Sequence, residues 1–487
     1  MKTKLLFLLF ILLSDFVWSQ TTSWTKYYDN ANTSEFETTI QKINQKLYIV
    51  SISENYQGGN SNGDVLPTLR ILNFKGEVLC YNRFQQGNLN NYRNYKINKV
   101  TINESRIFVN GICTNKLDNK NNNYSLLLNI DGSYINSKFD STQNYTFLTS
   151  SIHLNNIIEL YSETISVDSS ILHSEKYNDS LYFINQNSIP INNLGFIKII
   201  DRKVFICNTK ASINNKIVFK ISIYSQALDI IKSKSDTSEI EIDLSQFYNY
   251  SVTELDTSYG NYILYGRFYG LKNNPKINGL ELDYYNVKID SASLRIENEY
   301  YSNKFNSDAN TVEVIANSIR SKEFANSSVI LSKVYTSNLS SSTKFRLELI
   351  NNNQRIWYNY LDSLVPNIST GLSLNIIPLK SNLIVSTYIF NKGLVLTEYD
   401  SDGNKIQTSI DSLEPTLINS GVNNILEGDS NTVFVFGHIF RNGSTDSDLL
   451  LKKIYWKSTG IEKIINTRKK TRIYPNPAVS TPKNPTV

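Results

Sequence analysis

The chain has little of the residues that build metal and redox centres. Its 487 residues include three cysteines, three histidines and one methionine. Cys80, Cys113 and Cys207 lie far apart and form no C-x-x-C pair, which excludes the usual zinc spacing. Their odd number excludes complete pairing within the chain. We therefore predict that they are small buried residues on β-strands.

An excess of charge of one sign is missing too. Lys and Arg number 49 and Asp and Glu 44, for a net charge of +5. The charges are scattered along the chain, and a nucleic-acid-binding protein needs a basic stripe on one face. We expect no nucleic-acid partner.

Long apolar runs are absent after the first residues, so we expect no membrane span in the mature chain. Residues 1–20 have a basic start followed by the apolar run Leu5–Leu13. That run is shorter than the ~20 residues of a spanning helix, which makes a membrane anchor the weaker interpretation. It predicts a secretory signal peptide, cut before Gln20 or Thr21.

What the chain does have is aromatic and turn-forming residues. It contains 31 Tyr and 22 Phe, and Asn and Ser are abundant. This mixture favours strands and turns, and no long stretch has helical periodicity. The prediction is an all-β protein.

One pattern recurs: an apolar strand ending in glycine, a polar loop, and a second apolar strand. About eight such units follow one another at an average spacing of about 55 residues, which is typical of a solenoid or propeller. The clearest three pairs are Val433–Gly437 with Asp448–Ile454, Tyr262–Gly266 with Tyr284–Ile289, and Ile107–Gly111 with Ser125–Ile130.

The repeats predict a β-propeller of seven or eight blades, with four short antiparallel strands per blade, over residues 21–465. Leu47–Val50 is taken as an inner strand, and Trp24–Tyr28 is expected to complete the last blade by pairing the two ends of the chain. Residues 233–249 are taken as a polar insertion. Tandem β-sandwich domains are the alternative architecture.

Candidate sites are few. His153, His173 and His438 are assigned to three separate units, so no histidine metal cluster is expected. His438 follows the end of a strand taken as inner, where a polar group at a channel mouth is the weaker interpretation. Residues 400–404, Asp-Ser-Asp-Gly-Asn, resemble the start of a calcium loop, but the late Glu of such a loop is missing and a hairpin turn is favoured.

No motif for a catalytic or cofactor site is present. The chain lacks a G-x-S-x-G elbow, an H-E-x-x-H pair, a phosphate-binding glycine loop and a dinucleotide fingerprint. Residues 355–360, Arg-Ile-Trp-Tyr-Asn-Tyr, are interpreted as an outer blade strand rather than as a sugar-stacking platform. We therefore predict no catalytic residues, no cofactor and no metal.

The C-terminal residues carry a recognisable motif. A basic connector, residues 466–473, precedes Tyr474, Pro475, Asn476, Pro477 and Ala478. This motif resembles the opening of the C-terminal sorting domain of type IX secretion substrates of Bacteroidetes. The resemblance implies the secretion machinery as a partner, a β-rich passenger and a secreted or outer-surface location. Only a short tail follows, so residues 474–487 correspond to a truncated start of such a domain, and a periplasmic location is the alternative.

The sequence thus favours an exported binding module over an enzyme. A rigid ring with long polar loops suits recognition of an extracellular glycan or protein. The alternative is a secreted propeller-type hydrolase acting on polysaccharide, for which two carboxylates should face each other across a cleft.

Overall fold

The structure is a computed structural model of the chain. It describes residues 24–28, 33–55, 65–84, 87–140, 145–153, 156–166, 169–192, 195–212, 214, 216–239, 241, 247–258, 260–271, 281–301, 314–315, 320–324, 327–335, 344–351, 354–361, 375–378, 382–389, 393–411, 417–428, 432–441 and 447–455. The expected signal peptide (1–20), the basic connector (466–473) and the sorting motif (474–478) lie outside these residues.

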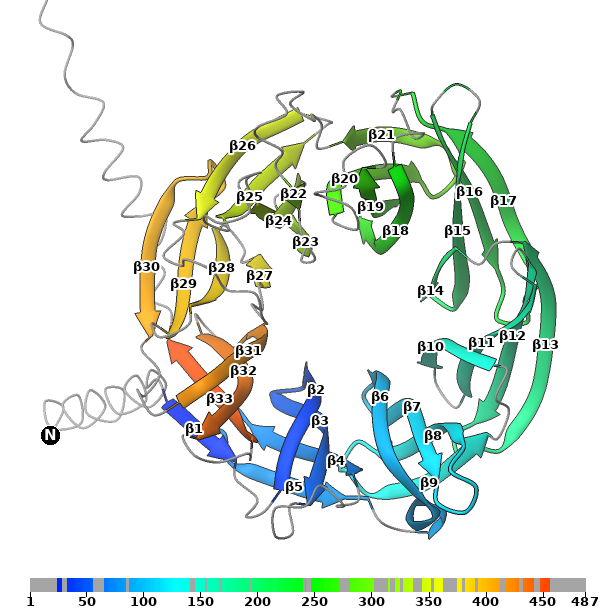
Figure 1. Cartoon of the computed structure of the whole chain (residues 1–487), viewed down its shortest axis with the longest axis vertical. Helices are drawn as coiled ribbons and strands as arrows, with labels where there is room; N and C mark the ends of the chain where they lie inside the picture. The colour runs from blue at the N-terminus through cyan, green and yellow to red at the C-terminus, as the bar shows by residue number, and fades with distance from the viewer. Residues whose placement is uncertain are drawn as a thin grey trace, which may run out of the picture.

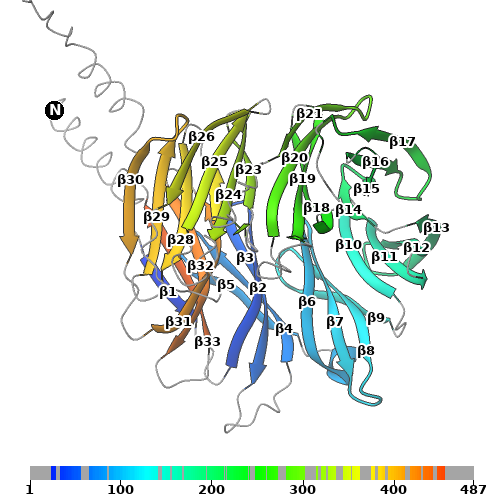
Figure 2. The same ribbon diagram turned by 45° about the horizontal axis from the view of Figure 1, so that its top comes forward.

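The described strands form eight antiparallel sheets arranged as blades around a ring (Figure 1). Seven sheets have four strands and one has five. The predicted β-propeller is therefore confirmed, with eight blades. Tandem sandwiches would require sheets stacked in pairs, and the blades instead follow one another around a centre (Figure 2).

Blades 1 to 4 follow the chain in order, each built of four consecutive strands. Blade 1 contains β2 (Thr33–Ile43), β3 (Lys46–Asn55), β4 (Val65–Asn73) and β5 (Val78–Arg83). After the short 3-10 helix η1 (Gly87–Asn91), blade 2 contains β6 (Tyr92–Ile102), β7 (Arg106–Asn115), β8 (Asn121–Asn129) and β9 (Tyr134–Asp140). Blade 3 contains β10 (Tyr145–His153), β11 (Asn156–Ser166), β12 (Ser169–Asn178) and β13 (Phe183–Asn192). Blade 4 contains β14 (Phe196–Ile200), β15 (Lys203–Ala211), β16 (Ile217–Tyr224) and β17 (Ile230–Thr237).

Blades 5 to 8 complete the ring. Blade 5 contains β18 (Phe247–Ser258), β19 (Asn261–Leu271), β20 (Glu281–Asp290) and β21 (Ile296–Tyr301). Blade 6 contains β22 (Val314–Ile315), β23 (Arg320–Phe324), β24 (Ser327–Tyr335), β25 (Lys344–Asn351) and β26 (Gln354–Leu361). Blade 7 contains β27 (Asn375–Pro378), β28 (Asn382–Ile389), β29 (Gly393–Asp400) and β30 (Lys405–Asp411). Blade 8 contains β31 (Leu417–Glu427), β32 (Thr432–Arg441), β33 (Ser447–Tyr455) and β1 (Trp24–Tyr28).

The two ends of the chain close the ring. Strand β1 pairs antiparallel with β33, with Trp24 opposite Lys453 and Tyr28 opposite Leu449, so the first strand becomes the outermost strand of the last blade. Lys26 Nζ and Tyr28 Oη both donate to the carbonyl oxygen of Gly76 in blade 1, at 3.0 and 2.8 Å. The predicted closure by Trp24–Tyr28 is confirmed.

The inner strands differ from the sequence interpretation. Leu47–Val50 belongs to β3, the second strand of blade 1, while the inner position is occupied by the more polar β2. Inner strands β2, β6, β10, β18 and β31 each show a register shift against their partner, as a β-bulge gives. In blade 6 the two short segments β22 and β23 both pair with β24.

The prediction of a polar insertion at residues 233–249 is wrong at both ends of the range. Residues up to Thr237 belong to β17, the outer strand of blade 4, and β18 of blade 5 begins at Phe247. The error has a physical cause. An outer strand has solvent along one edge and is largely exposed, so its residues need not be apolar and it lacks the buried-strand pattern.

The core lies between neighbouring blades. Phe219 and Ile221 of blade 4 pack against Leu264, Tyr285 and other apolar residues of blade 5, and all four of these side chains are buried. Cys113 and Cys207 lie buried on β7 and β15, as predicted for small strand residues. Cys80 on β5 is only half-buried.

A repeated hydrogen bond also links the blades. An asparagine on the outer strand of one blade donates from Nδ2 to a backbone carbonyl in the last hairpin turn of the next blade. We call this contact the blade latch. It joins Asn82 to Gly132 at 2.8 Å, Asn136 to Ser180 at 2.9 Å and Asn359 to Gly403 at 2.5 Å.

Within the described part of the chain, no helix has the length and hydropathy needed to cross a bilayer.

Candidate functional site

A cluster of polar side chains lies between blades 2 and 3, at a position we call the blade 2/3 seam. Successive residues of a strand point to opposite faces, so Glu159, Tyr161 and Glu163 of β11 share one face. The register of β12 places Glu175 opposite Glu159 and His173 opposite Tyr161. Strands β7, β8 and β9 of blade 2 supply the other side of the seam.

Glu159 lies at the buried end of the seam, with its side chain 0% exposed. Its carboxylate accepts hydrogen bonds from Ser125 Oγ at 2.5 Å and Tyr161 Oη at 2.9 Å, and also from Asn110 Nδ2. Lys138 Nζ lies 3.8 Å from Oε2. A buried carboxylate is tolerated only with such partners, because it has lost its hydration.

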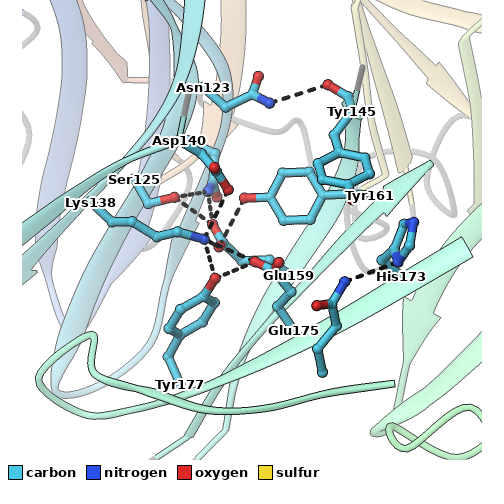
Figure 3. Close-up of polar contacts among 12 residues, drawn as sticks. Asn123, Ser125, Lys138, Asp140, Tyr145, Glu159, Tyr161, His173, Glu175 and Tyr177 are labelled. Atoms are coloured by element: carbon cyan, nitrogen blue, oxygen red, sulfur yellow. Dashed lines mark hydrogen bonds and ion pairs between the residues drawn. The ribbon is translucent and has the colours of Figure 1, made fainter. Parts of the chain in front are cut away.

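Lys138 occupies the middle of the seam and connects the carboxylates of the two blades (Figure 3). Its Nζ lies 2.9 Å from Glu175 Oε2 and 3.5 Å from Asp140 Oδ2, and it also contacts Tyr177 Oη. The lysine side chain is 24% exposed, so the seam opens to solvent at this point.

Burial and neighbouring charges both shift the pKa values of these groups, in opposite directions for Glu159 and Lys138. Burial raises the pKa of Glu159, and Lys138 together with the hydroxyls of Ser125 and Tyr161 offsets part of that rise. Burial alone would lower the pKa of Lys138, but the charges of Glu159, Glu175 and Asp140 outweigh it and raise the pKa. Burial raises the pKa of the Tyr161 phenol well above its usual range, and the Glu159 charge adds to the rise.

Farther along the seam, His173 connects three neighbouring strands. Its Nδ1 lies 2.8 Å from Ser188 Oγ and 3.0 Å from Gln186 Nε2, both on β13. Its Nε2 lies 3.2 Å from Glu163 Oε2 on β11. The Tyr145 ring packs against the imidazole in an edge-to-face arrangement, at a centroid distance of 4.9 Å. The imidazole is thus fixed on both nitrogens and on one side of its ring.

The outer strand of blade 3 is the exposed border of the seam. Tyr182 in the preceding turn and Phe183 at the start of β13 are 67% and 58% exposed. The Phe183 ring packs against buried Tyr177 at a centroid distance of 5.9 Å, which fixes its orientation. Asn185 and Gln186 follow, both exposed. Strand β13 carries no charged residue.

The carboxylates of the seam do not form the open pair that glycoside hydrolysis requires. Glu175 and Asp140 come from different blades, but the ammonium group of Lys138 lies between them, and Glu159 is sealed from solvent. A general acid and a nucleophile must both reach the substrate. Among the described residues, no group of His, Cys, Asp and Glu side chains is arranged to hold a metal ion.

The structure corrects the placement of the histidines. His153 lies on β10 and His173 on β12, so two of the three share blade 3. His438 lies on β32, the second strand of blade 8, and not on an inner strand. The side chains of His153 and His438 lie outside the described residues. Among the histidine side chains that the structure describes, His173 is the one in the candidate site.

Two predictions that favoured a structural role over a binding site are confirmed, one for a hairpin turn and one for an outer strand. Asp400 Oδ1 accepts from the backbone N–H groups of Asp402 and Asn404 at 2.9 and 2.8 Å, which closes the hairpin between β29 and β30. Its oxygen is thus used within the turn. Trp357 lies on β26, the outer strand of blade 6, as predicted, and its indole N–H donates to Ser401 O at 3.0 Å. The predicted sorting motif, Tyr474 to Ala478, lies outside the described residues.

Sequence reasoning missed the seam itself. The one local signal was Glu159, a lone acid in an otherwise apolar strand start, Ile157-Ile158-Glu159-Leu160. Such a residue is rarely buried without a partner. Its partners Lys138 and Ser125 belong to the preceding blade, and only the packing of blades 2 and 3 brings them together.

Comparisons with known proteins bear on the fold alone. The chain matches none of the known protein-family models and none of the curated proteins. Among solved structures it is similar to the β-propeller domain of the Trilobed protease from Pyrococcus furiosus, with TM-score 0.37, 10% identity, 74% of this chain and 93% of that chain covered. A prolyl endopeptidase gives TM-score 0.40 at 7% identity, covering 85% of this chain and 54% of that one. Drosophila Plexin A in complex with Semaphorin 1b gives a TM-score of 0.37 at 8% identity, and the match covers 74% of this chain and 84% of that one. These are distant likenesses in the course of the chain, and the assignment as a propeller rests on the strand pairing itself.

Proposed function

We propose that the chain is an exported β-propeller that acts as a binding module, and that it takes an extracellular glycan at the outer strand of blade 3. The observation that carries the proposal is the pair of exposed rings at Tyr182 and Phe183, with the exposed amides of Asn185 and Gln186 on opposite faces of the strand that follows. The export step rests on the expected signal peptide and on the resemblance of residues 474–478 to a sorting motif.

The chemistry of these side chains suits an uncharged sugar. Aromatic rings offer a flat apolar face for the C–H groups of a pyranose, and amide side chains both donate to and accept from hydroxyls. Because Phe183 is held by Tyr177, its ring loses little freedom when a ligand binds. The absence of charge on β13 suits hydroxyl groups better than an acidic or basic partner.

Blade 4 provides a matched control. Ile230 and Ile231 are exposed at the start of its outer strand β17, at the place that Phe183 and Ile184 occupy in blade 3. They are aliphatic, and Lys232 and Lys234 follow them. Burial of apolar area alone would use both places equally, whereas sugar stacking requires the rings.

The test is a glycan array, followed by calorimetric titration of any glycan bound. We expect Y182A/F183A to lose at least about tenfold in affinity, since one stacked ring contributes about 1 kcal/mol or more. The I230A/I231A variant should bind as the wild type does. Equal loss in both variants, or binding that depends on Ile230 and Ile231 alone, would indicate a protein partner instead.

Export has its own test. Native cells would be fractionated and the terminal peptides identified by mass spectrometry. Recovery at the surface or in the medium supports an exported module, whereas recovery of the intact chain in the periplasm contradicts secretion across the outer membrane.

A further inference from the structure

Three residues on adjacent strands of blade 3 form a hydrogen-bonded relay that the binding role does not use. Glu163 on β11, His173 on β12 and Ser188 on β13 lie on the same face of the sheet. Register places Ser188 directly opposite His173. The distances are 2.8 Å from Ser188 Oγ to Nδ1 and 3.2 Å from Nε2 to Glu163 Oε2.

The hydrogen-bond partners determine which nitrogen of His173 carries the proton. Glu163 can only accept when ionised, so Nε2 is the N–H that donates to it. Gln186 Nε2 can only donate, so Nδ1 is the lone-pair nitrogen. Ser188 therefore donates its hydroxyl proton to the same lone pair of Nδ1, which it shares with the Gln186 N–H. A neutral imidazole that accepts from a hydroxyl, with a carboxylate on its other nitrogen, is the arrangement of a base-activated nucleophile.

The exposure of His173 and Ser188 also fits a base and a nucleophile. The His173 side chain is only 8% exposed and packs against the Tyr145 ring, so the base is held in place. Ser188 is exposed on the outer strand and can meet a substrate from solvent. We propose that Ser188, with His173 as its base and Glu163 as the residue that orients it, is an acyl-transfer site for small carboxylic esters.

The step balances without a cofactor. As Ser188 Oγ forms a bond to the acyl carbon, its proton passes to His173 Nδ1. The bond from the acyl carbon to the alcohol oxygen breaks, and the alcohol leaves with that proton. Water then attacks the acyl-serine by the same route, releases the carboxylic acid and restores the serine hydroxyl. Once Nδ1 is protonated it no longer accepts from Gln186, whose N–H is then free to stabilise the carbonyl oxygen.

Blade 4 again supplies a matched control. Ser235 is exposed on β17 and lies opposite Lys220 where Ser188 lies opposite His173. It is a serine on the outer strand of a blade without an imidazole beside it. A difference between the two serines therefore isolates the effect of the relay.

The experiment treats the full chain with an alkyl fluorophosphonate, in which the serine oxygen displaces fluoride from phosphorus. The adduct is mapped by peptide mass spectrometry. We expect one adduct, on Ser188, forming at least about 100-fold faster than any on Ser235, the lower end of general-base catalysis. S188A should abolish it and S235A should not change it. H173N should slow labelling by a similar factor, and E163Q by about tenfold, with partial recovery in E163D. Melting curves would establish that each variant is folded.

Hydrolysis of p-nitrophenyl acetate gives a second readout. A burst of nitrophenolate equal to the protein concentration, absent in S188A, is expected for an acyl-serine intermediate. Labelling of Ser188 no faster than of Ser235 in the folded wild type would overturn the proposal. A rate unaffected by H173N in a folded variant would overturn it as well.

Discussion

Gly266 on β19 lies directly opposite Tyr285 on β20, and a Cβ at position 266 would fall 2.0 Å from the Tyr285 ring carbon Cζ. Gly111 has the same relationship to Tyr124 in blade 2, where the nearest ring atom would be 2.5 Å away. Both tyrosines are buried. At these two positions the glycine that ends the apolar strand is therefore needed for space, because an aromatic ring from the neighbouring strand lies over its Cα.

Replacing Gly266 by alanine should destabilise the protein by about 2–3 kcal/mol, since the Tyr285 ring must shift within a packed core. Gly260 is the matched control. It has a positive φ of 78° but nothing within 4 Å of its Cβ position, so G260A carries only backbone strain. That strain costs about 1 kcal/mol. Denaturant unfolding of both variants measures the difference, and equal losses would refute the steric account.

The blade latch can be tested at Asn82. Changing it to leucine keeps a side chain of similar size but removes the donor to Gly132 O. The carbonyl then loses a partner in a half-buried place, at a cost of about 1–2 kcal/mol. The control is N185L on the exposed outer strand β13, which should change stability by less than about 0.5 kcal/mol. If N82L unfolds at the same denaturant concentration as N185L, the latch does not contribute to stability.

The apolar strands of this fold could be predicted from sequence, and the polar ones could not. Val433, Phe434, Val435 and Phe436 are all buried, since one face of this second strand packs on blade 7 and the other on blade 1. Their continuous apolar run is what such burial requires. Strand β6 lines the inner side of its blade and alternates buried and exposed positions irregularly around its bulges. The apolar residues of β6 therefore have no regular spacing from which a strand could be predicted.

The site was harder to predict than the fold for a related reason. Glu159 and Lys138 are brought together by the packing of one blade on the next, and no local spacing encodes that packing. Ser188 and His173 meet because of the register of β12 on β13. The hairpin between these strands contains a register shift at Lys176 and Tyr177, which changes which residues lie opposite one another. Residue types were visible in the sequence, but their convergence was not.

Lys138 should be the residue of the seam most sensitive to substitution. In K138M the carboxylates of Glu159, Glu175 and Asp140 lose their shared cation while remaining close together. Breaking a buried ion pair costs about 3–5 kcal/mol, and partial exposure of Lys138 lowers this to about 2–3 kcal/mol. The control is K75M in an exposed turn, which should be near neutral. Thermal unfolding at pH 7 compares the stabilities of the two variants. A K138M protein as stable as K75M would show that the ion pairs of Lys138 do not stabilise the fold.

The pH dependence of stability tests the electrostatics of Glu159. Burial raises the pKa of this carboxyl in the folded protein, so the folded state binds the proton more tightly than the unfolded state does. The wild type should therefore gain stability relative to E159Q as the pH falls from 7 toward about 4.5, the unfolded pKa range of Glu. It should lose that advantage as the pH rises through the pKa of the folded state. E104Q serves as the control, because Glu104 is an exposed carboxyl in the turn between β6 and β7. The measurement is the free energy of unfolding of the wild type and of both variants at pH 5, 6 and 7. A wild-type advantage over E159Q that grows with rising pH would mean that the hydrogen bonds of Ser125, Asn110 and Tyr161 stabilise the carboxylate more than burial destabilises it.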